Sequence, residues 1–378
     1  MSATVRVTLL TNLVPPYRSA AYDALQHCAY LAGGGLRVLC TQRREPQRNW
    51  ASPAGSYECA TLSGLQIPLG ENRTLAIPFG VARALSAKPA DILILGGFGI
   101  AQWQAQNWAL AHDIPTVLQF DGWLGSDAAY SNPVRQRLRR TLIARADGFL
   151  AASTSGASWF ESHGALPQHI RVAPIPPSFP IPAATANRTR SERCYDLLWC
   201  GRTTKSKGFD IFVLIAAKLS KAGMAQRIAI AGSTDIPKTT EVLKSVGLEN
   251  HADVFDQLPP DDLPPILTNS KIALFPSRND AYGVGVIDVI TCGAVALTSA
   301  VTGCAPDVLQ PPEILPVDDP QRWVSACERL LAKPELLETT RQQQAKAIAN
   351  NNPAHHGETI WNAVHDAINR KTEVRQWG

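Results

Sequence analysis

PSRNDAYGVGVIDVITCG, residues 276–293, is the stretch around which this chain is organised. It follows a short apolar run, Ile272–Phe275, which is typical of a buried strand. A loop then carries Asp280, and the run Tyr282–Val284 opens an apolar helix. Because a helix start presents unpaired N–H groups and the positive end of the helix dipole, it suits a phosphate. The stretch therefore predicts a strand–turn–helix joint with an anion site.

Two carboxylates flank this helix start, since Asp288 lies eight positions beyond Asp280. Gly283 and Gly285 would let a ligand approach the backbone closely, where a side chain would obstruct it. A diphosphate on the helix start, with a carboxylate at each end of the ligand, would suit a nucleotide sugar. Asp280 would then bind sugar hydroxyls and Asp288 the ribose. The alternative interpretation is an ordinary joint in which Asp280 caps the helix.

Length and composition limit the class of protein. A chain of 378 residues exceeds what one core usually covers, so we expect two domains. A content of 45% apolar and 18% charged residues is typical of a globular protein. A net charge of +4 gives no sign of a nucleic-acid partner. Eight scattered cysteines, no signal-peptide pattern and no run of about 18 apolar residues lead us to expect a cytoplasmic protein without a membrane span.

Strand and helix patterns alternate along both halves, which favours parallel sheets covered by helices. We expect proline- and glycine-rich connections over Pro46–Gly70 and polar helical sequence over Glu335–Lys371. Between the halves, Pro174–Arg193 is rich in proline and then in small and polar residues, as a linker is. The predicted strands are Val5–Leu10, Leu36–Cys40, Ile92–Leu95, Pro115–Phe120, Gly148–Ala151, Asp196–Cys200, Arg227–Ala231, Val254–Phe255, Ile272–Phe275 and Ala294–Leu297.

A basic loop follows the first strand of the second half. Gly201 and Arg202 come directly after that strand, and Lys205, Lys207 and Gly208 follow. Arginine offers a fixed fork for diphosphate oxygens, and lysine a point charge on a flexible stem. Fixed cations stabilise the negative charge that builds on a leaving diphosphate. Lys205 competes with Lys207 for this role, and the glycine that follows favours Lys207.

These motifs resemble those of retaining glycosyltransferases of the family 4 type, the group 1 glycosyltransferases. Residues 276–293 are similar to the E-x7-E signature with aspartate at both acidic positions, and GRTTKSKGFDIFV is similar to the G-R-x(n)-K-G segment. The resemblance implies that Arg202 and Lys207 hold the diphosphate, Asp280 the donor sugar and Asp288 the ribose. Because aspartate is one methylene shorter than glutamate, both acidic contacts would be displaced or mediated by water.

The resemblance further implies a GT-B fold: two Rossmann-like α/β domains that face a cleft. We expect an acceptor-side domain over residues 1–175, a linker over 176–194, a nucleotide-sugar domain over 195–352 and a C-terminal helix over 353–378 that packs back on the first domain. No two carboxylates stand at i, i+2, so a DxD metal motif is missing. We therefore expect metal-independent transfer without a cofactor.

The first half carries weaker signals. Pro15 and Pro16 precede Arg18, which would face the cleft or be a surface arginine. Members of the family often place a histidine after the strand that corresponds to Pro115–Phe120, where this chain has Asp121. Asp121 is therefore a candidate contact to the reacting sugar or the acceptor hydroxyl, with a structural cap as the alternative.

Residues 135–145 form a basic amphipathic pattern, RQRLRRTLIAR. Such a face attracts anionic lipid headgroups, which would dock the protein on the cytoplasmic face of a membrane beside a lipid-linked acceptor. A solvated surface helix is the alternative.

The sequence thus predicts a retaining transfer from a nucleoside-diphosphate sugar to a glycan or lipid-linked acceptor, in polysaccharide or glycolipid synthesis. A nucleotide-sugar epimerase of the same fold and a non-catalytic two-lobed sugar-binding protein stay open. The predicted catalytic residues are Arg202, Lys207, Asp280 and Asp121. The predicted donor-binding residues are Gly201, Tyr282, Gly283, Val284 and Asp288.

Overall fold

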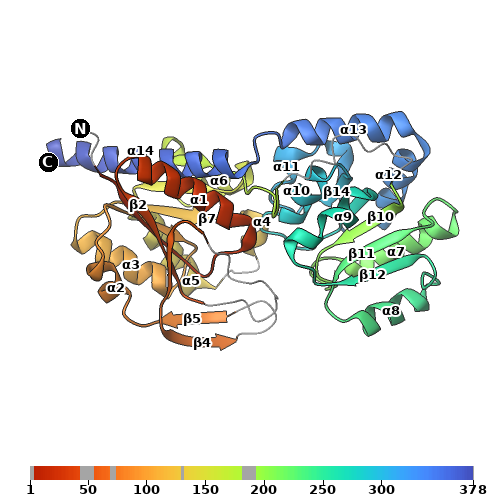
Figure 1. Cartoon of the computed structure of the whole chain (residues 1–378), viewed down its shortest axis with the longest axis horizontal. Coiled ribbons are helices and arrows are strands. Elements are labelled where there is room, and N and C mark those ends of the chain that lie inside the picture. The colour runs from red at the N-terminus through yellow and green to blue at the C-terminus, as the bar shows by residue number, and fades with distance from the viewer. Residues whose placement is uncertain (1–3, 43–54, 69–73, 129–131, 181–192, 378) are drawn as a thin grey trace. The chain divides into compact units, whose positions relative to one another are not determined.

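The computed structural model describes residues 4–42, 55–68, 74–128, 132–180 and 193–377 (Figure 1). The chain divides into two compact units. Unit 1 comprises Met1–Pro176 and Asn351–Gly378, and unit 2 comprises Pro177–Asn350. Most of the predicted linker, residues 181–192, lies outside the described residues.

Unit 1 is built on a seven-stranded sheet in the order β3-β2-β1-β6-β7-β8-β9, and its neighbouring strands all run parallel. The central strand β6 has the sequence ILILG, whose four apolar residues are all buried, as a strand covered on both faces requires. An antiparallel pair, β4 (Gly64–Pro68) and β5 (Thr74–Pro78), stands apart from this sheet. The parallel strands are β1 (Arg6–Thr11), β2 (Gly35–Cys40), β3 (Glu58–Thr61), β6 (Ile92–Gly96), β7 (Thr116–Phe120), β8 (Gly148–Ala151) and β9 (Ile170–Val172).

Helices cover both faces of this sheet. On one face α1 (Pro16–Leu31) lies beside α14 (Pro353–Trp377), which brings the end of the chain onto its beginning (Figure 1). Ile360, Val364 and Ala367 of α14 are fully buried in that core. The other face is covered by α2 (Val81–Ala87), α3 (Ile100–Ala111), α5 (Pro133–Ala144) and α6 (Thr154–Ser162), and the short α4 (Leu124–Asp127) follows β7.

Unit 2 contains a six-stranded parallel sheet in the order β12-β11-β10-β13-β14-β15. Its core includes Phe212, Trp323 and the apolar residues of the central strands. The strands are β10 (Tyr195–Cys200), β11 (Ile228–Ser233), β12 (Ala252–Asp256), β13 (Ser270–Phe275), β14 (Val295–Ser299) and β15 (Ile314–Leu315). The helices are α7 (Phe209–Lys221), α8 (Ile236–Ser245), α9 (Pro264–Thr268), α10 (Val284–Thr291), α11 (Ala305–Val308), α12 (Pro320–Ala332) and α13 (Pro334–Ala347).

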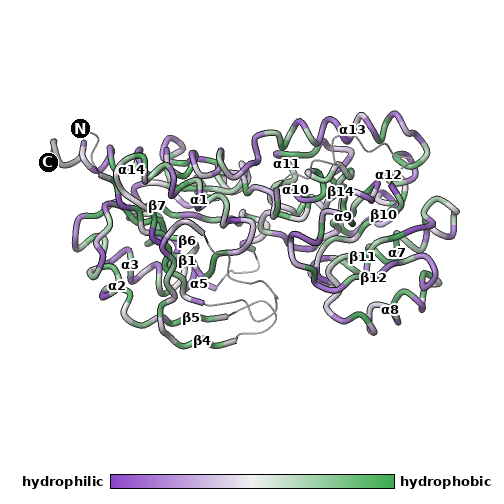
Figure 2. The backbone as a smooth tube through the Cα atoms, in the orientation of Figure 1, coloured by the Kyte–Doolittle hydropathy of each residue, from purple (hydrophilic) through white to green (hydrophobic). Residues whose placement is uncertain are grey.

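The predicted fold class, two α/β domains with parallel sheets, is confirmed. The expectation of connections alone over Pro46–Gly70 is wrong, since β3 and β4 lie within that range. The polar helical sequence over Glu335–Lys371 forms two helices, because α13 ends at Ala347 and Pro353 starts α14. Figure 2 shows hydrophobic residues concentrated on the sheet strands within each unit. Among the described residues, no helix is long and apolar enough to cross a membrane.

Candidate functional site

The loop after β10 places Arg202 at the carboxyl end of a central strand of unit 2. Gly201 has φ of +146°, a backbone conformation that favours glycine, and its N–H donates to the carbonyl of Ala231 at 2.9 Å. A Cβ on Gly232 would lie 2.7 Å from the carbonyl oxygen of Gly201. The loops after β10 and β11 therefore pack backbone against backbone. Half-buried Arg202 is the first residue beyond this contact.

Lys207 is positioned by a second close contact between loops. Gly208 has φ of +80°, and a Cβ there would lie 1.9 Å from the carbonyl oxygen of Pro276. Only glycine lets the start of α7 approach the loop after β13 so closely. Lys205 is exposed, and its carbonyl accepts a hydrogen bond from Nη1 of Arg278 at 2.6 Å. The contact carries Lys207 towards the loop that holds Asp280.

Lys207 and Asp280 form an ion pair in which Nζ lies 2.6 Å from Oδ2. Their side chains are 29% and 18% exposed, so the pair is partly screened from water and still reachable. The backbone of Asp280 is held by Val301, whose carbonyl accepts from its N–H at 3.3 Å. The structure thus brings together two predicted catalytic residues that are 73 positions apart in the sequence. The cap interpretation of Asp280 is wrong, since Gly283 is the N-cap of α10 and no side chain caps it.

Close packing within unit 2 also requires the glycines at the start of α10. Gly283 has φ of +98°, and a Cβ there would lie 2.5 Å from Cγ2 of Thr302. A Cβ on Gly285 would lie 3.1 Å from the ring of Phe275. Protein atoms therefore occupy the position that a side chain would take at both glycines. Tyr282 is buried beside this packed helix start, and Val284, the first residue of α10, is half-buried.

Asp288 is buried in α10, with 4% of its surface exposed. Its Oδ1 accepts from the backbone N–H of Ser178 at 2.7 Å, and its Oδ2 accepts from the hydroxyl of Ser178 at 2.9 Å. Burial raises the pKa of Asp288 to about 7, against the opposing effect of these two hydrogen bonds. The carboxylate expected to bind a ribose is engaged by Ser178 in this structure.

The raised pKa of Asp288 predicts a stability that falls with rising pH. The unfolded carboxyl ionises near pH 4 and the folded one near pH 7, so wild type loses stability across that window. Asp288→Asn does not titrate, and we expect its unfolding free energy to fall less, by on the order of 2–3 kcal/mol, between about pH 5 and pH 8. Urea midpoints at the two pH values measure the difference. Equal pH slopes for both proteins would contradict the assignment.

In unit 1, Asp121 follows β7 and is ion-paired with Arg18 of α1. Oδ1 of Asp121 lies 2.5 Å from Nη2 of Arg18, and the two side chains are 38% and 4% exposed. The interpretation of Arg18 as a surface arginine is therefore wrong. Burial by itself would lower the pKa of Arg18. The attraction of its charge to Asp121 acts in the opposite direction, and the pKa of Arg18 is raised above its ordinary value.

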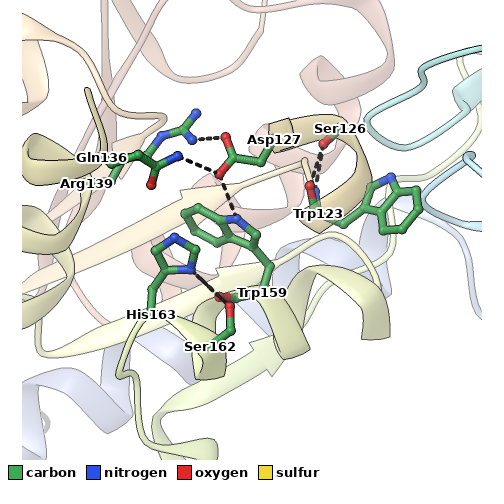
Figure 3. Close-up of polar contacts among 8 residues, drawn as sticks. All are labelled: Trp123, Ser126, Asp127, Gln136, Arg139, Trp159, Ser162 and His163. Atoms are coloured by element: carbon green, nitrogen blue, oxygen red, sulfur yellow. Dashed lines mark hydrogen bonds and ion pairs between the residues drawn. The ribbon is translucent and has the colours of Figure 1, made fainter. Parts of the chain in front are cut away.

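A buried arginine that the sequence did not reveal lies on α5. Figure 3 shows Arg139 pointing to the carboxylate of Asp127, with which it forms an ion pair. Oδ2 of Asp127 also accepts from Nε1 of Trp159 at 3.0 Å and from Nε2 of Gln136 at 3.3 Å. The guanidinium lies 5.9 Å from the ring centroid of Phe120. One arginine of the predicted lipid-facing pattern is thus part of the core, and it fixes α4 just after Asp121.

Two family models match the chain. Residues 185–347 match the family described as glycosyl transferases group 1, and residues 2–176 match a glycosyl transferase 4-like domain. Together they cover most of both units.

Curated relatives are about a quarter identical to the chain over the aligned segments. It is 26% identical over 269 residues to the D-inositol 3-phosphate glycosyltransferase of Acidothermus cellulolyticus, which covers 65% of this chain and 59% of that protein. It is 25% identical over 178 residues to the enzyme of the same name from Segniliparus rotundus, covering 44% and 37%. The aligned part thus spans less than two thirds of the length of these relatives.

Solved structures share the fold at low identity. Anabaena HepE in complex with UDP superposes with a TM-score of 0.74 at 12% identity, over 95% of this chain and 99% of that one. Sucrose-phosphate synthase from Thermosynechococcus elongatus gives a TM-score of 0.66 at 17% identity, over 98% and 99%. These similarities concern the architecture of the two units.

Proposed function

Because the chain belongs to the group 1 glycosyltransferases, we propose that it is a retaining enzyme of GT-B fold that uses a nucleoside-diphosphate sugar. The sugar passes to a glycan or a lipid-linked acceptor in polysaccharide or glycolipid synthesis. The observation that carries this proposal is the ion pair between Lys207 and Asp280, at the carboxyl ends of the central strands of unit 2. Ligands of open parallel sheets bind beyond those strand ends.

Each candidate residue has a proposed part in the transfer. Arg202 and Lys207 stabilise the negative charge that develops on the leaving diphosphate. Asp280 orients Lys207 and accepts hydrogen bonds from hydroxyls of the donor sugar. Asp121 contacts the reacting sugar or the acceptor hydroxyl. Backbone groups of Gly201, Tyr282, Gly283 and Val284 line the donor, and Asp288 binds the ribose once Ser178 releases it.

A thermal-shift screen with UDP, GDP and ADP in excess EDTA tests the donor class and metal independence together. Proteins of this fold have been solved with UDP and with UDP-glucose, which supports a nucleotide donor. At a hundred-fold excess over Kd, a nucleotide stabilises the folded state by about 2.7 kcal/mol, so we expect one of the three to raise Tm by several degrees. Turnover of the matching sugar nucleotide should also persist in EDTA. If EDTA abolished both the Tm shift and the turnover, and its removal restored them, metal independence would be contradicted.

Product analysis with the nucleotide sugar that the screen selects distinguishes an enzyme from a binding protein. Incubation of the nucleotide sugar with mixed glycan and lipid acceptors should release nucleoside diphosphate and form a glycosidic product with retained configuration. Binding without release would favour a sugar-binding protein, and an epimerised sugar without acceptor would favour an epimerase.

For the acceptor side we propose peripheral docking of α5 on an anionic membrane. Arg135, Arg137, Arg140 and Arg145 are exposed, and Val134 beside them is 78% exposed. Each basic residue near an anionic surface contributes about 1 kcal/mol. Liposomes with anionic lipid should therefore sediment the wild type, and replacement of these four arginines by glutamine should abolish sedimentation. Equal pelleting with neutral and anionic liposomes would remove the docking proposal.

A further inference from the structure

A buried series of polar contacts in unit 1 connects Asp121 to the C-terminal helix. Nη2 of Arg18 binds Oδ1 of Asp121 at 2.5 Å, and Nη1 of the same guanidinium lies 2.9 Å from Nε2 of His356 on α14. Nδ1 of His356 lies 2.8 Å from the carbonyl oxygen of Pro174. Arg18 and His356 are both almost fully buried. Four residues from distant parts of the sequence thus form one continuous network.

The chemistry of the donors fixes the protonation of this network. A guanidinium carries only donors, so Nε2 of His356 must accept. The ring proton therefore sits on Nδ1 and is donated to the carbonyl of Pro174. Burial, and next the positive charge of Arg18, lower the pKa of His356 to about 3. The ring is consequently neutral, with both nitrogens satisfied.

The network also joins the two points where the chain passes between units. The first segment of unit 1 ends at Pro176, two residues after Pro174, and the second begins at Asn351, five residues before His356. Asp121 stands at the opposite end, directly after β7, and is the most exposed member that contributes a side chain. Among the described residues, Arg18 alone donates to its carboxylate, through Oδ1. Oδ2 is then available to accept from a hydroxyl.

We propose that Arg18 and His356 are positioning residues for the transfer reaction: they fix the position of the Asp121 carboxylate, aim its second oxygen at a substrate hydroxyl, and connect it to both points where the chain passes between units. The inference rests on the proposed function, in which Asp121 contacts the reacting sugar or the acceptor hydroxyl. His356→Leu removes the acceptor of Nη1 of Arg18 and leaves the guanidinium bound to Asp121 alone. The amide oxygen introduced by His356→Gln can still accept from Arg18.

The first experiment reads the network without any activity. In ¹⁵N-histidine-labelled protein, the ring signals absent from His356→Gln belong to His356. We expect them to report the neutral Nδ1–H tautomer throughout about pH 5 to pH 8, while an exposed histidine titrates near 6.5. In Arg18→Met the midpoint should rise, because the adjacent positive charge is gone. A wild-type His356 that titrates with an ordinary midpoint, or carries its proton on Nε2, overturns the proposed network.

The second experiment reads positioning through turnover of the nucleotide sugar selected by the thermal-shift screen, UDP-glucose being the first probe. We expect His356→Leu to lower kcat about 10-fold while the donor KM and the Tm shift with UDP stay unchanged, because the donor residues lie in unit 2. His356→Gln should restore most of the rate. Asp121→Asn should lower kcat at least as much, and the double variant Asp121→Asn/His356→Leu no further, since both act through one carboxylate.

The outcomes separate this inference from the proposed function. A fully active Asp121→Asn enzyme removes the role of Asp121 and the positioning role with it. An impaired Asp121→Asn beside a fully active His356→Leu, or losses that multiply in the double variant, removes the positioning role alone. If His356→Leu fails to fold, His356→Gln and Arg18→Lys give the same comparison: the first should stay active and the second, which loses the fork, should not.

Discussion

Replacing Lys207 with alanine is expected to lower kcat about 10²- to 10³-fold, the loss typical when one fixed donor to a developing negative charge is removed. Lys207 is the cation that the structure holds against Asp280 at 2.6 Å. In the proposed mechanism, its removal takes positive charge from the leaving diphosphate, and it also removes the ion pair with Asp280. Steady-state turnover of the sugar nucleotide measures the loss, with Tm as a check that the variant folds.

The chain supplies its own control for this experiment. Lys205 lies two residues away and is exposed, so Lys205→Ala should retain activity within a few-fold. Arg202→Ala should resemble Lys207→Ala. Unchanged turnover in the double variant Arg202→Ala/Lys207→Ala would refute the proposed diphosphate site.

Replacing Arg139 with methionine is expected to destabilise unit 1 by about 3–5 kcal/mol, the usual result of breaking a buried ion pair from one side. The change leaves the Asp127 carboxylate buried, and among the described residues only Trp159 and Gln136 then donate hydrogen bonds to it. It also removes the guanidinium that lies 5.9 Å from the ring centroid of Phe120 and 5.7 Å from that of Trp159. Urea denaturation followed by tryptophan fluorescence gives the free energy of unfolding.

Arg140 is the matched control, because it is the next residue on α5 and is exposed. Arg140→Met should change the unfolding free energy by less than about 0.5 kcal/mol. Equal effects of the two substitutions would show that the pair between Arg139 and Asp127 contributes nothing in solution.

Much of the fold could be predicted because the central strands are short apolar runs bounded by glycine or polar loops. The sequence ILIL of β6 is such a run, and the structure buries all four residues. The missed strands lack this signal. Glu58–Thr61 is an edge strand with the sequence ECAT and little burial, and Ile170–Val172 is three residues long. Edge strands owe their formation to a neighbouring strand, which periodicity does not reveal.

The candidate site was predictable where spacing along one segment decides it, and unpredictable where distant segments meet. Residues 276–293 and the basic loop indicated Lys207 and Asp280 as residues of one site. Nothing in the sequence indicates that Ser178 engages Asp288 from 110 positions away. Similarly, no local pattern separates Arg139 from its exposed neighbours on the same helix. What distinguishes Arg139 is that its side of α5 faces Asp127, and this is known only from the tertiary structure.

The position of α14 has a consequence for how the protein is made. Ile360, Val364 and Ala367 complete the hydrophobic core of unit 1, although they are synthesised after every residue of unit 2. Domains usually fold in the order in which they leave the ribosome. Here the whole sequence of unit 2 is synthesised before unit 1 is complete. Unit 1 therefore exposes the apolar face that α14 covers until α14 has been synthesised. During translation, that exposed apolar face is therefore a surface on which the nascent chain can aggregate.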